Sequence, residues 1–148
     1  KMKKTEKQSK AKTIKAITVS GKRKEALARA IIREGSGEIR INKQPISLLP
    51  YIRRLFVSEP LTITQEVMPD LLQKVSINVN VHGGGAEAQI EASRLAIARA
   101  LVAFSQNKQL RDAFSNYDRH LLIADIRRKE TRKPGDSKAR AKRQKSYR

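Results

Sequence analysis

The side chains best suited to chemistry in this chain are lysines and arginines. Residues 127–148 hold 11 of the 33 basic residues and only two acids, Glu130 and Asp136. Cations at this density neutralise phosphates and release counterions from nucleic acid. The segment has no Leu, Ile, Val, Phe or Met to form a core, so we expect an arm that becomes ordered on RNA. Its candidate phosphate-binding residues are Arg127, Arg128, Arg132, Lys133, Lys138, Arg140, Lys142 and Arg143.

A second group of cations, Gly21-Lys22-Arg23-Lys24, follows the first apolar stretch of the chain. Lys22, Arg23 and Lys24 are candidate phosphate contacts, although a solvated turn explains the charge equally well. For residues 127–148 the alternative interpretation, from charge alone, is a solubilising or nuclear-targeting tail. Both groups nevertheless suit the same chemistry, which is the binding of a polyanion.

The triplet Gly83-Gly84-Gly85 before a helical stretch could place an anion on free backbone amides. A sharp reversal that needs positive φ and no Cβ is the favoured explanation, and no Lys-Ser or Lys-Thr pair follows as in a Walker A loop. His82 and His120, without cysteine, cannot form a structural zinc site. Asp118-Arg119 indicates a local ion pair or a loop cap. The sequence predicts no catalytic residue, metal or cofactor.

Composition divides the chain into a body and two basic ends. The formal net charge is +19, of which residues 1–15 hold +6 and residues 127–148 hold +9, leaving +4 for the rest. We predict a basic N-terminal extension at 1–13, a globular domain at 14–126 and an extended basic tail at 127–148. This field favours nucleic acid. A membrane is the weaker partner, because there is no basic amphipathic helix or apolar run of about 18 residues.

The absence of cysteine and the small number of aromatic residues narrow the possible functions further. The chain has no cysteine, which suits a reducing interior, and no apolar stretch follows its basic start, so we expect an intracellular protein. Its three Phe and three Tyr are too few for the base-stacking platforms of single-strand RNA-binding sheets. Recognition should therefore depend on phosphates and on shape.

The elements that must position these cations are strands followed by helices. Alternation over residues 74–82 predicts the clearest strand, and the pattern of residues 86–104 predicts the longest helix, with a smooth side at Ala92, Ala96 and Ala103. We expect further strands at 14–19 and 121–126. Short helices are expected at 51–57 and 109–117, and residues 61–72 should be helix or turn broken by Pro69.

Residues 25–33 are ambiguous, because their composition favours a helix while their alternation permits a strand. Gly35-Ser36-Gly37 indicates a tight turn before a strand at Ile39 and Ile41, so we interpret 25–33 as the partner strand of a hairpin. The predicted fold class is α+β, a mixed sheet with helices on one face, plus extended basic termini.

Four separated motifs resemble the small-subunit ribosomal protein nine family, over about residues 18–148. The most specific is Gly83-Gly84-Gly85-x-x-Ala88-Gln89-x-x-Ala92-x-x-x-Ala96-x-Ala98-Arg99-Ala100-Leu101. The others are Gly21-Lys22-Arg23-Lys24, Gly35-x-Gly37-x-Ile39-x-Ile41-Asn42, and the ending from Tyr117-Asp118-Arg119 to Lys145-Ser146-Tyr147-Arg148. The ending is similar to the archaeal and eukaryotic branch. Glu25 departs from the pattern, since the family commonly has Ser or Thr there.

The resemblance implies a ribosomal protein S5 domain 2-like body that binds ribosomal RNA in the head of the small subunit, next to other ribosomal proteins. It also implies a tail that reaches the anticodon stem-loop of the peptidyl-site tRNA, a contact that falls on Lys145, Ser146, Tyr147 and Arg148. Such a protein is not an enzyme, has no small-molecule substrate and acts in cytoplasmic ribosomes. The alternative is a free-standing basic RNA chaperone or nucleic-acid-compacting protein. Small-molecule kinases share the broad fold, but their loop carries serines where this one continues Ala-Glu-Ala.

Overall fold

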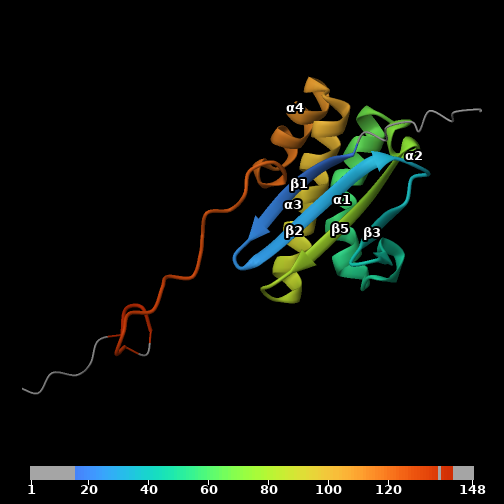
Figure 1. Ribbon diagram of the computed structural model, residues 1–148. Coiled ribbons are helices and arrows are strands. Elements are labelled where there is room, and N and C mark those ends of the chain that lie inside the picture. Colours follow the sequence, from blue (N-terminus) through green and yellow to red (C-terminus); the bar gives the residue numbers. More distant parts are fainter. Residues whose placement is uncertain (1–15, 137, 142–148) are drawn as a thin grey trace, which may run out of the picture.

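A five-stranded mixed sheet and a layer of helices form the body of the protein (Figure 1). The structure is a computed structural model that describes residues 16–136 and 138–141. The strand order is β1-β2-β5-β3-β4, and β3 and β5 run parallel while the other neighbours are antiparallel. The elements are β1 (Ile17–Arg23), β2 (Ala26–Glu34), β3 (Ile39–Ile41), β4 (Gln44–Pro45), η1 (Ile46–Leu48), α1 (Tyr51–Val67), α2 (Leu71–Lys74), β5 (Val75–His82), α3 (Ala86–Ser105), α4 (Lys108–Tyr117) and η2 (Arg119–Leu121).

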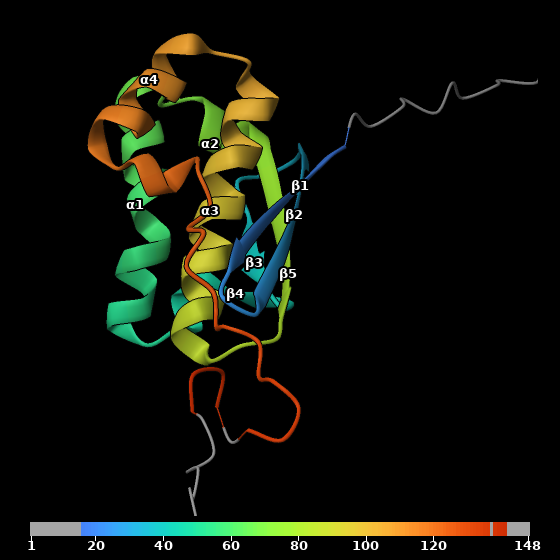
Figure 2. The ribbon, with the colours of Figure 1, turned by 90° about the vertical axis from the view of Figure 1, so that its left-hand side faces the viewer.

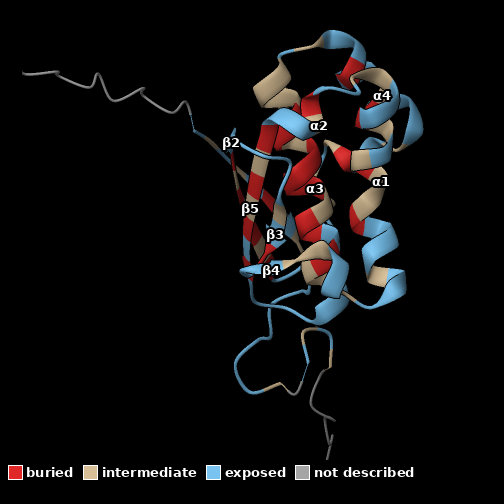
Figure 3. Cartoon of the chain, turned by 90° about the vertical axis from the view of Figure 1, so that its right-hand side faces the viewer, coloured by how far each residue is buried: buried red, intermediate tan, exposed pale blue. Residues whose placement is uncertain are grey.

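The helices lie on one face of the sheet, and the buried residues lie between the two layers (Figures 2 and 3). From the sheet, Ile32 and Ile77 are fully buried, and from α3, Ile97 and Leu101 are fully buried. Each such side chain contributes about 1.5–3 kcal/mol to stability, as an upper estimate. The predicted α+β class, with helices on one face of a mixed sheet, is confirmed.

Close contact between β1 and α3 depends on small residues on both sides. A Cβ on Gly21 would collide with the carbonyl oxygen of Ala92 and lie 2.8 Å from the amide nitrogen of Ala96. Ala92 and Ala96 are themselves fully buried. The smooth side predicted for this helix is therefore the side that the backbone of β1 approaches.

The strand at residues 25–33 is confirmed, but the predicted hairpin pairing is wrong. β2 pairs with β1 and β5, and β5 lies between β2 and β3. The turn at residues 35–37 therefore connects β2 and β3, which are not adjacent in the sheet. Its backbone amides donate to residues at the start of β5: Gly35 N to Lys74 O at 2.9 Å and Gly37 N to Val75 O at 3.1 Å.

The helix predicted at 51–57 is longer than expected, since α1 continues to Val67 with Pro60 inside it. Proline removes one backbone donor from a helix, and burial here outweighs that loss. Val57, Pro60 and Thr64 form the buried side of α1, and the Thr64 hydroxyl donates to Pro60 O at 2.7 Å. The break at Pro69 is confirmed, because α1 ends before it and α2 begins after it.

The strand predicted at 121–126 is wrong. Residues 119–121 form η2, and residues 122–136 and 138–141, which the structure describes, form no strand. Leu121 is fully buried. The carbonyl of Leu122 is bound by the side chain of Arg99 from α3 at 2.8 Å, instead of by a neighbouring strand. Leu121 and Leu122 therefore pack on the helical layer, whereas Ile123 and Ile126 of the same segment are exposed.

Candidate nucleic-acid interface

Glycines bring the start of α3 against the turn between β1 and β2. Gly83 and Gly84 have φ angles of 76° and 63°, which favour glycine. A Cβ on Gly83 would lie 2.6 Å from the carbonyl oxygen of Glu25, and one on Gly84 would lie 3.0 Å from the amide nitrogen of Ala26. Positive φ and close packing explain these two glycines, as the sequence favoured.

An open hollow of about 950 Å³ lies at this end of the domain, and cations from two distant segments line it. β1 and the turn after it supply Lys22 and Lys24. The start of the tail supplies Arg127, Arg128 and Lys129. The remaining lining residues are Glu25, Gly84, Gly85 and Ala88. We call this site the basic hollow.

The first turn of α3 adds to the positive character of the basic hollow. Unpaired amide groups give a helix N-terminus a partial positive charge. Glu87 lies in that turn and opposes it, but its carboxylate accepts a hydrogen bond from Arg53 Nε at 3.0 Å. Glu25, by contrast, lines the hollow and forms no ion pair with the described residues. Its negative charge therefore opposes that of the surrounding cations.

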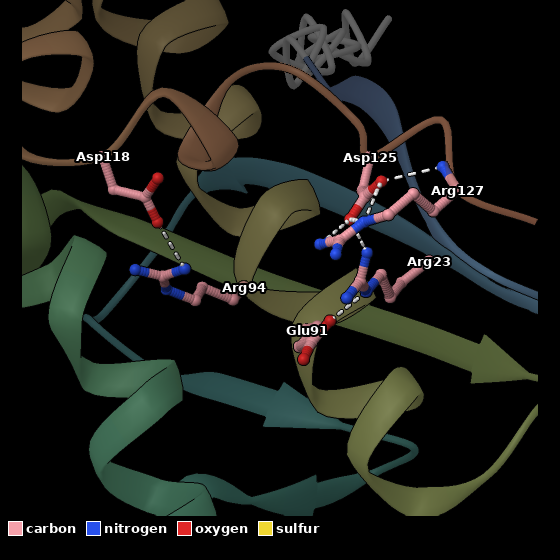
Figure 4. Close-up of polar contacts among 6 residues, drawn as sticks. All are labelled: Arg23, Glu91, Arg94, Asp118, Asp125 and Arg127. Atoms are coloured by element: carbon pink, nitrogen blue, oxygen red, sulfur yellow. Dashed lines mark hydrogen bonds and ion pairs between the residues drawn. The ribbon is translucent and has the colours of Figure 1, made fainter.

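The root of the tail is fixed by four charged residues, which we call the tail clamp: Arg23, Glu91, Asp125 and Arg127 (Figure 4). The carboxylate of Asp125 accepts hydrogen bonds from the backbone amide of Arg127 at 2.8 Å and from its Nε and Nη2 at 2.9 and 2.7 Å. Arg23 bridges Asp125 to Glu91 of α3. The tail is therefore joined to both β1 and α3.

Electrostatics keeps the tail clamp charged. The hydrogen bonds from the Arg127 side chain and then from its amide hold the pKa of Asp125 well below its ordinary value of 3.8, and Arg23 lowers it further. The same contact with Asp125 raises the pKa of Arg127. Because the Asp125 side chain is only 10% exposed, its charge acts mainly on these two arginines. The clamp sets the direction in which Arg128 and Lys129 enter the basic hollow.

Arg99 of α3 makes a further tie to the segment before the tail. Its Nε donates to Leu122 O at 2.8 Å and its Nη1 donates to Ser20 O at 2.9 Å. The Arg99 guanidinium therefore holds the backbone of β1 and of the segment after η2 together.

Arg94 of α3 connects two other helical elements. It pairs with Glu59 of α1. It also pairs with Asp118 at 3.0 Å, as Figure 4 shows. Asp118 also caps η2, because its carboxylate accepts a hydrogen bond from the amide of His120 at 2.8 Å. Burial raises the pKa of Asp118, but the His120 amide and Arg94 outweigh burial and leave the pKa below 3.8. The expected loop cap is present, and Arg94 provides the ion pair.

The sequence-predicted residues fall into four places. Lys22, Lys24, Arg127 and Arg128 line the basic hollow, while the guanidinium of Arg23 is held in the tail clamp. Arg132, Lys133 and Lys138 are exposed on the tail, and Arg140 pairs with Glu130 at 2.8 Å. The following predicted residues lie outside the described part of the chain: Lys142, Arg143, Lys145, Ser146, Tyr147 and Arg148.

Sequence reasoning missed the acids that position the cations. Asp125 fell within the strand predicted at 121–126 and Glu91 within the helix predicted at 86–104, and neither acid was given a role. A local signal for Asp125 was available, since an acid two residues before an arginine can accept both its amide and its side chain. No local signal links Arg23 to Asp125, which is 102 residues away.

Other kinds of site are not assembled by the described residues. Within 16–136 and 138–141, no three acids or histidines are grouped so that they could hold a metal ion. None of the helices in this part of the chain combines the length and the apolar character that crossing a membrane requires.

Fold and site together define the class as a basic α+β domain with a hollow lined by cations. Residues 21–148 match the ribosomal protein S9/S16 family. The chain is 47% identical to small ribosomal subunit protein uS9 of Pyrobaculum aerophilum over 137 residues, which cover 92% of this chain and 94% of the relative. It is 42% identical to small ribosomal subunit protein uS9 of Methanococcus maripaludis over 138 residues, covering 91% and 100%. The chain belongs to the ribosomal protein S9/S16 family.

Family membership confirms the resemblance found in the sequence motifs and identifies a non-enzymatic ribosomal protein. Both relatives are archaeal, as the ending of the chain indicated. Glycine-rich loops of small-molecule kinases are therefore not the correct comparison for Gly83-Gly84-Gly85. The ribosome is the setting in which the basic hollow and the tail clamp have to be understood.

Proposed function

We propose that this ribosomal protein is a structural constituent of the small ribosomal subunit, acting in cytoplasmic ribosomes. Its globular domain, 14–126, binds ribosomal RNA of the subunit head beside other ribosomal proteins, and its tail, 127–148, extends along RNA. Two relatives named as small-subunit proteins support this assignment. The observation that carries it is the convergence of cations from β1 and from the tail on one hollow.

The basic hollow can hold phosphates because its cations are free to do so. Lys22, Lys24 and Arg128 form no ion pair with the described residues, whereas Arg23 and Arg127 are held by acids. A guanidinium can donate two parallel hydrogen bonds to a phosphate, and each neutralised phosphate releases counterions. The mechanism is neutralisation and bracing of folded RNA without reading of its sequence.

The end of the tail carries the finer part of the proposal. By family resemblance, Lys145, Ser146, Tyr147 and Arg148 contact the backbone of the anticodon stem-loop of the peptidyl-site tRNA. The tail clamp supports this role, because a fixed root limits the directions in which a long basic segment can leave the domain. Contact through phosphates would suit every tRNA that enters the site.

The hollow is tested with the full-length variant Lys24→Gln/Arg128→Gln. Its affinity for small-subunit RNA should fall, and the slope of log affinity against log salt should decrease by about 1 for each lost phosphate contact. Lys108→Gln/Arg111→Gln is the matched control, because it removes the same charge from exposed positions of α4. Equal slopes for both variants would exclude the hollow as an RNA site.

The tail is tested by removing residues 146–148. Subunit assembly should be unchanged, while retention of tRNA in the peptidyl site should weaken. Unchanged tRNA affinity of truncated subunits would contradict the proposed tail contact. In parallel, the full-length chain should stay with small subunits after a moderate salt wash, and its release would instead indicate a free-standing compacting protein.

A further inference from the structure

The face of the sheet opposite the helices is left uncovered by the described elements (Figures 1 and 2). Because successive strand residues point to opposite faces, the residues between the buried ones point outward. Along β2 the buried residues are Ala26, Ala28, Ala30 and Ile32, which alternate with the outward Leu27, Arg29, Ile31 and Arg33. This outward surface is what we call the cationic sheet face.

The charged groups of the cationic sheet face are Lys22 on β1, Arg29 and Arg33 on β2, and Arg40 on β3. Arg40 pairs with Glu38 just before β3. Arg29 and Arg33 are exposed and have no ion pair with any acid in the described residues. Unpaired cations on an open sheet face indicate an anionic partner that is not part of this chain.

We propose that the cationic sheet face is a second RNA-binding surface, which adjoins the basic hollow and whose ligand is double-helical ribosomal RNA. This inference rests on the proposed function and specifies a further surface of the same protein. Phosphates would meet the arginines. Polar side chains of the neighbouring strands β1 and β5 would meet the 2′-hydroxyl groups that the wide, shallow minor groove of A-form RNA displays.

The strand register places the arginines at separations suited to several phosphates. Arg29 and Arg33 are four residues apart on one strand, about 13 Å at roughly 3.3 Å per residue. Asn78 of β5 pairs with Ile31 of β2 on one side and with Arg40 of β3 on the other. Arg40 is therefore two strands from Ile31, about 10 Å away across the sheet. The backbone positions of the three arginines therefore form a triangle. Arg29 and Arg33, which have no ion pair with the described residues, can each bind a different phosphate.

The neutral side chains of the face favour a duplex over a single strand. Sheets that bind single-stranded RNA stack bases on aromatic residues. The outward positions of the strands hold no Phe, Tyr or Trp; Leu27 and Ile31 of β2 are apolar, and His82 at the end of β5 is the single aromatic side chain among them. The polar outward residues are Thr18 and Ser20 on β1 and Ser76, Asn78 and Asn80 on β5. Amide and hydroxyl groups of this kind donate and accept hydrogen bonds from a 2′-hydroxyl. DNA lacks that group, so the surface suits RNA.

The cationic sheet face is continuous with the basic hollow. Lys22 points outward from β1 and also lines the hollow. Lys22 aligns with Leu27, and Leu27 aligns with His82, so this row forms the shared border. RNA on the sheet and RNA at the hollow would thus lie on adjoining sides of one rigid domain. The domain would brace two segments of RNA against each other.

The test compares three full-length variants that each remove two positive charges: Arg29→Gln/Arg33→Gln on the sheet, Lys24→Gln/Arg128→Gln in the hollow, and Lys108→Gln/Arg111→Gln on α4. Hydroxyl-radical footprinting of small-subunit RNA bound to each variant is the main readout. The sheet variant should lose protection at base-paired nucleotides that the hollow variant still protects. Its salt slope should decrease by roughly 1.5, about 0.7–0.9 for each phosphate contact.

Several outcomes would overturn the inference. If the sheet variant protects the same nucleotides as the α4 variant, the sheet face does not bind RNA. If the sheet variant loses protection at unpaired nucleotides, the face binds single-stranded RNA instead. If it loses protection at the same nucleotides as the hollow variant, the two surfaces form one site. Far-UV circular dichroism and the melting temperature should match wild type, since both arginines are exposed. If the wild-type chain protects no RNA, the proposed function is wrong. If the hollow variant loses protection while the sheet variant protects RNA as the α4 variant does, this inference alone is wrong.

Discussion

Replacing Gly21 by alanine tests the contact on which the position of β1 depends. The added Cβ would meet backbone atoms, the Ala92 oxygen and the Ala96 nitrogen of α3, and not the end of a flexible side chain. The helix cannot yield at one residue without moving its neighbours. β1 and α3 would therefore have to separate, and Arg23 with Glu91 would separate with them.

Two opposing effects decide the magnitude. Alanine restricts the unfolded chain more than glycine does, which stabilises by about 0.4–1 kcal/mol. Forcing a methyl group into a packed interior costs typically about 1–3 kcal/mol. Because the obstructing atoms are backbone, we expect the upper part of that range, and a net loss of about 1–2 kcal/mol. A domain of roughly 110 residues has an unfolding entropy near 0.23 kcal/mol/K, so the melting temperature should fall by about 4–9 °C.

The assay is thermal unfolding of the full-length variant by calorimetry or circular dichroism at fixed salt. Ser20→Ala is the matched control, because it lies next to Gly21 on the same strand and its side chain is exposed. That control should remain within about 0.5 kcal/mol of wild type. A Gly21→Ala protein that melts at or above the wild-type temperature would refute the close approach of β1 to α3.

Three further predictions concern charge. Asp125→Asn should speed trypsin cleavage after Arg127 several-fold in timed proteolysis while the body stays folded, and an unchanged rate would contradict the tail clamp. Asp118 and Asp125 have folded pKa values below the ordinary 3.8, so the stability they contribute is present above that value and is lost as the pH falls below it. Between about pH 6 and pH 3, the melting temperature of Asp118→Asn/Asp125→Asn should therefore fall less steeply than that of wild type. Parallel plots of melting temperature against pH would refute the contribution of these two aspartates to stability. Glu25→Ser should raise RNA affinity roughly threefold, as removal of one screened surface charge allows, and a lower affinity would remove Glu25 from the interface.

Long periodic segments were predictable from the sequence. Strict alternation from Val75 to His82 identified β5, and the repeat of apolar and small residues identified α3 from Ala86 almost to its end. The candidate cations Lys22, Lys24, Arg127 and Arg128 were found because charge density is itself a local property. Side-chain period and local charge need no knowledge of the rest of the fold.

Arrangements that depend on distant residues were not predictable. β5 inserts between β2 and β3, so the glycine turn at 35–37 does not join paired strands. Pro60 remains helical because tertiary burial outweighs its local preference. The apolar residues after Leu121 have the composition of a strand. Their contact with Arg99 of α3, whose side chain donates to the backbone carbonyl of Leu122, has no signal in the local sequence. Arg23 was assigned to phosphate binding from its neighbours, while its acids come from α3 and from residue 125.

The tail clamp also has a consequence for the order of events during synthesis. Arg23 is made before its partner Asp125, which follows 102 residues later. A growing chain leaves the ribosome from its N-terminus, and domains generally fold as units. The clamp can close only once β1 and α3 are docked and the residues as far as Arg127 have emerged. In a nascent or truncated domain, the tail cations would therefore not be held beside those of β1. A tail fixed by the clamp indicates that the domain has finished folding.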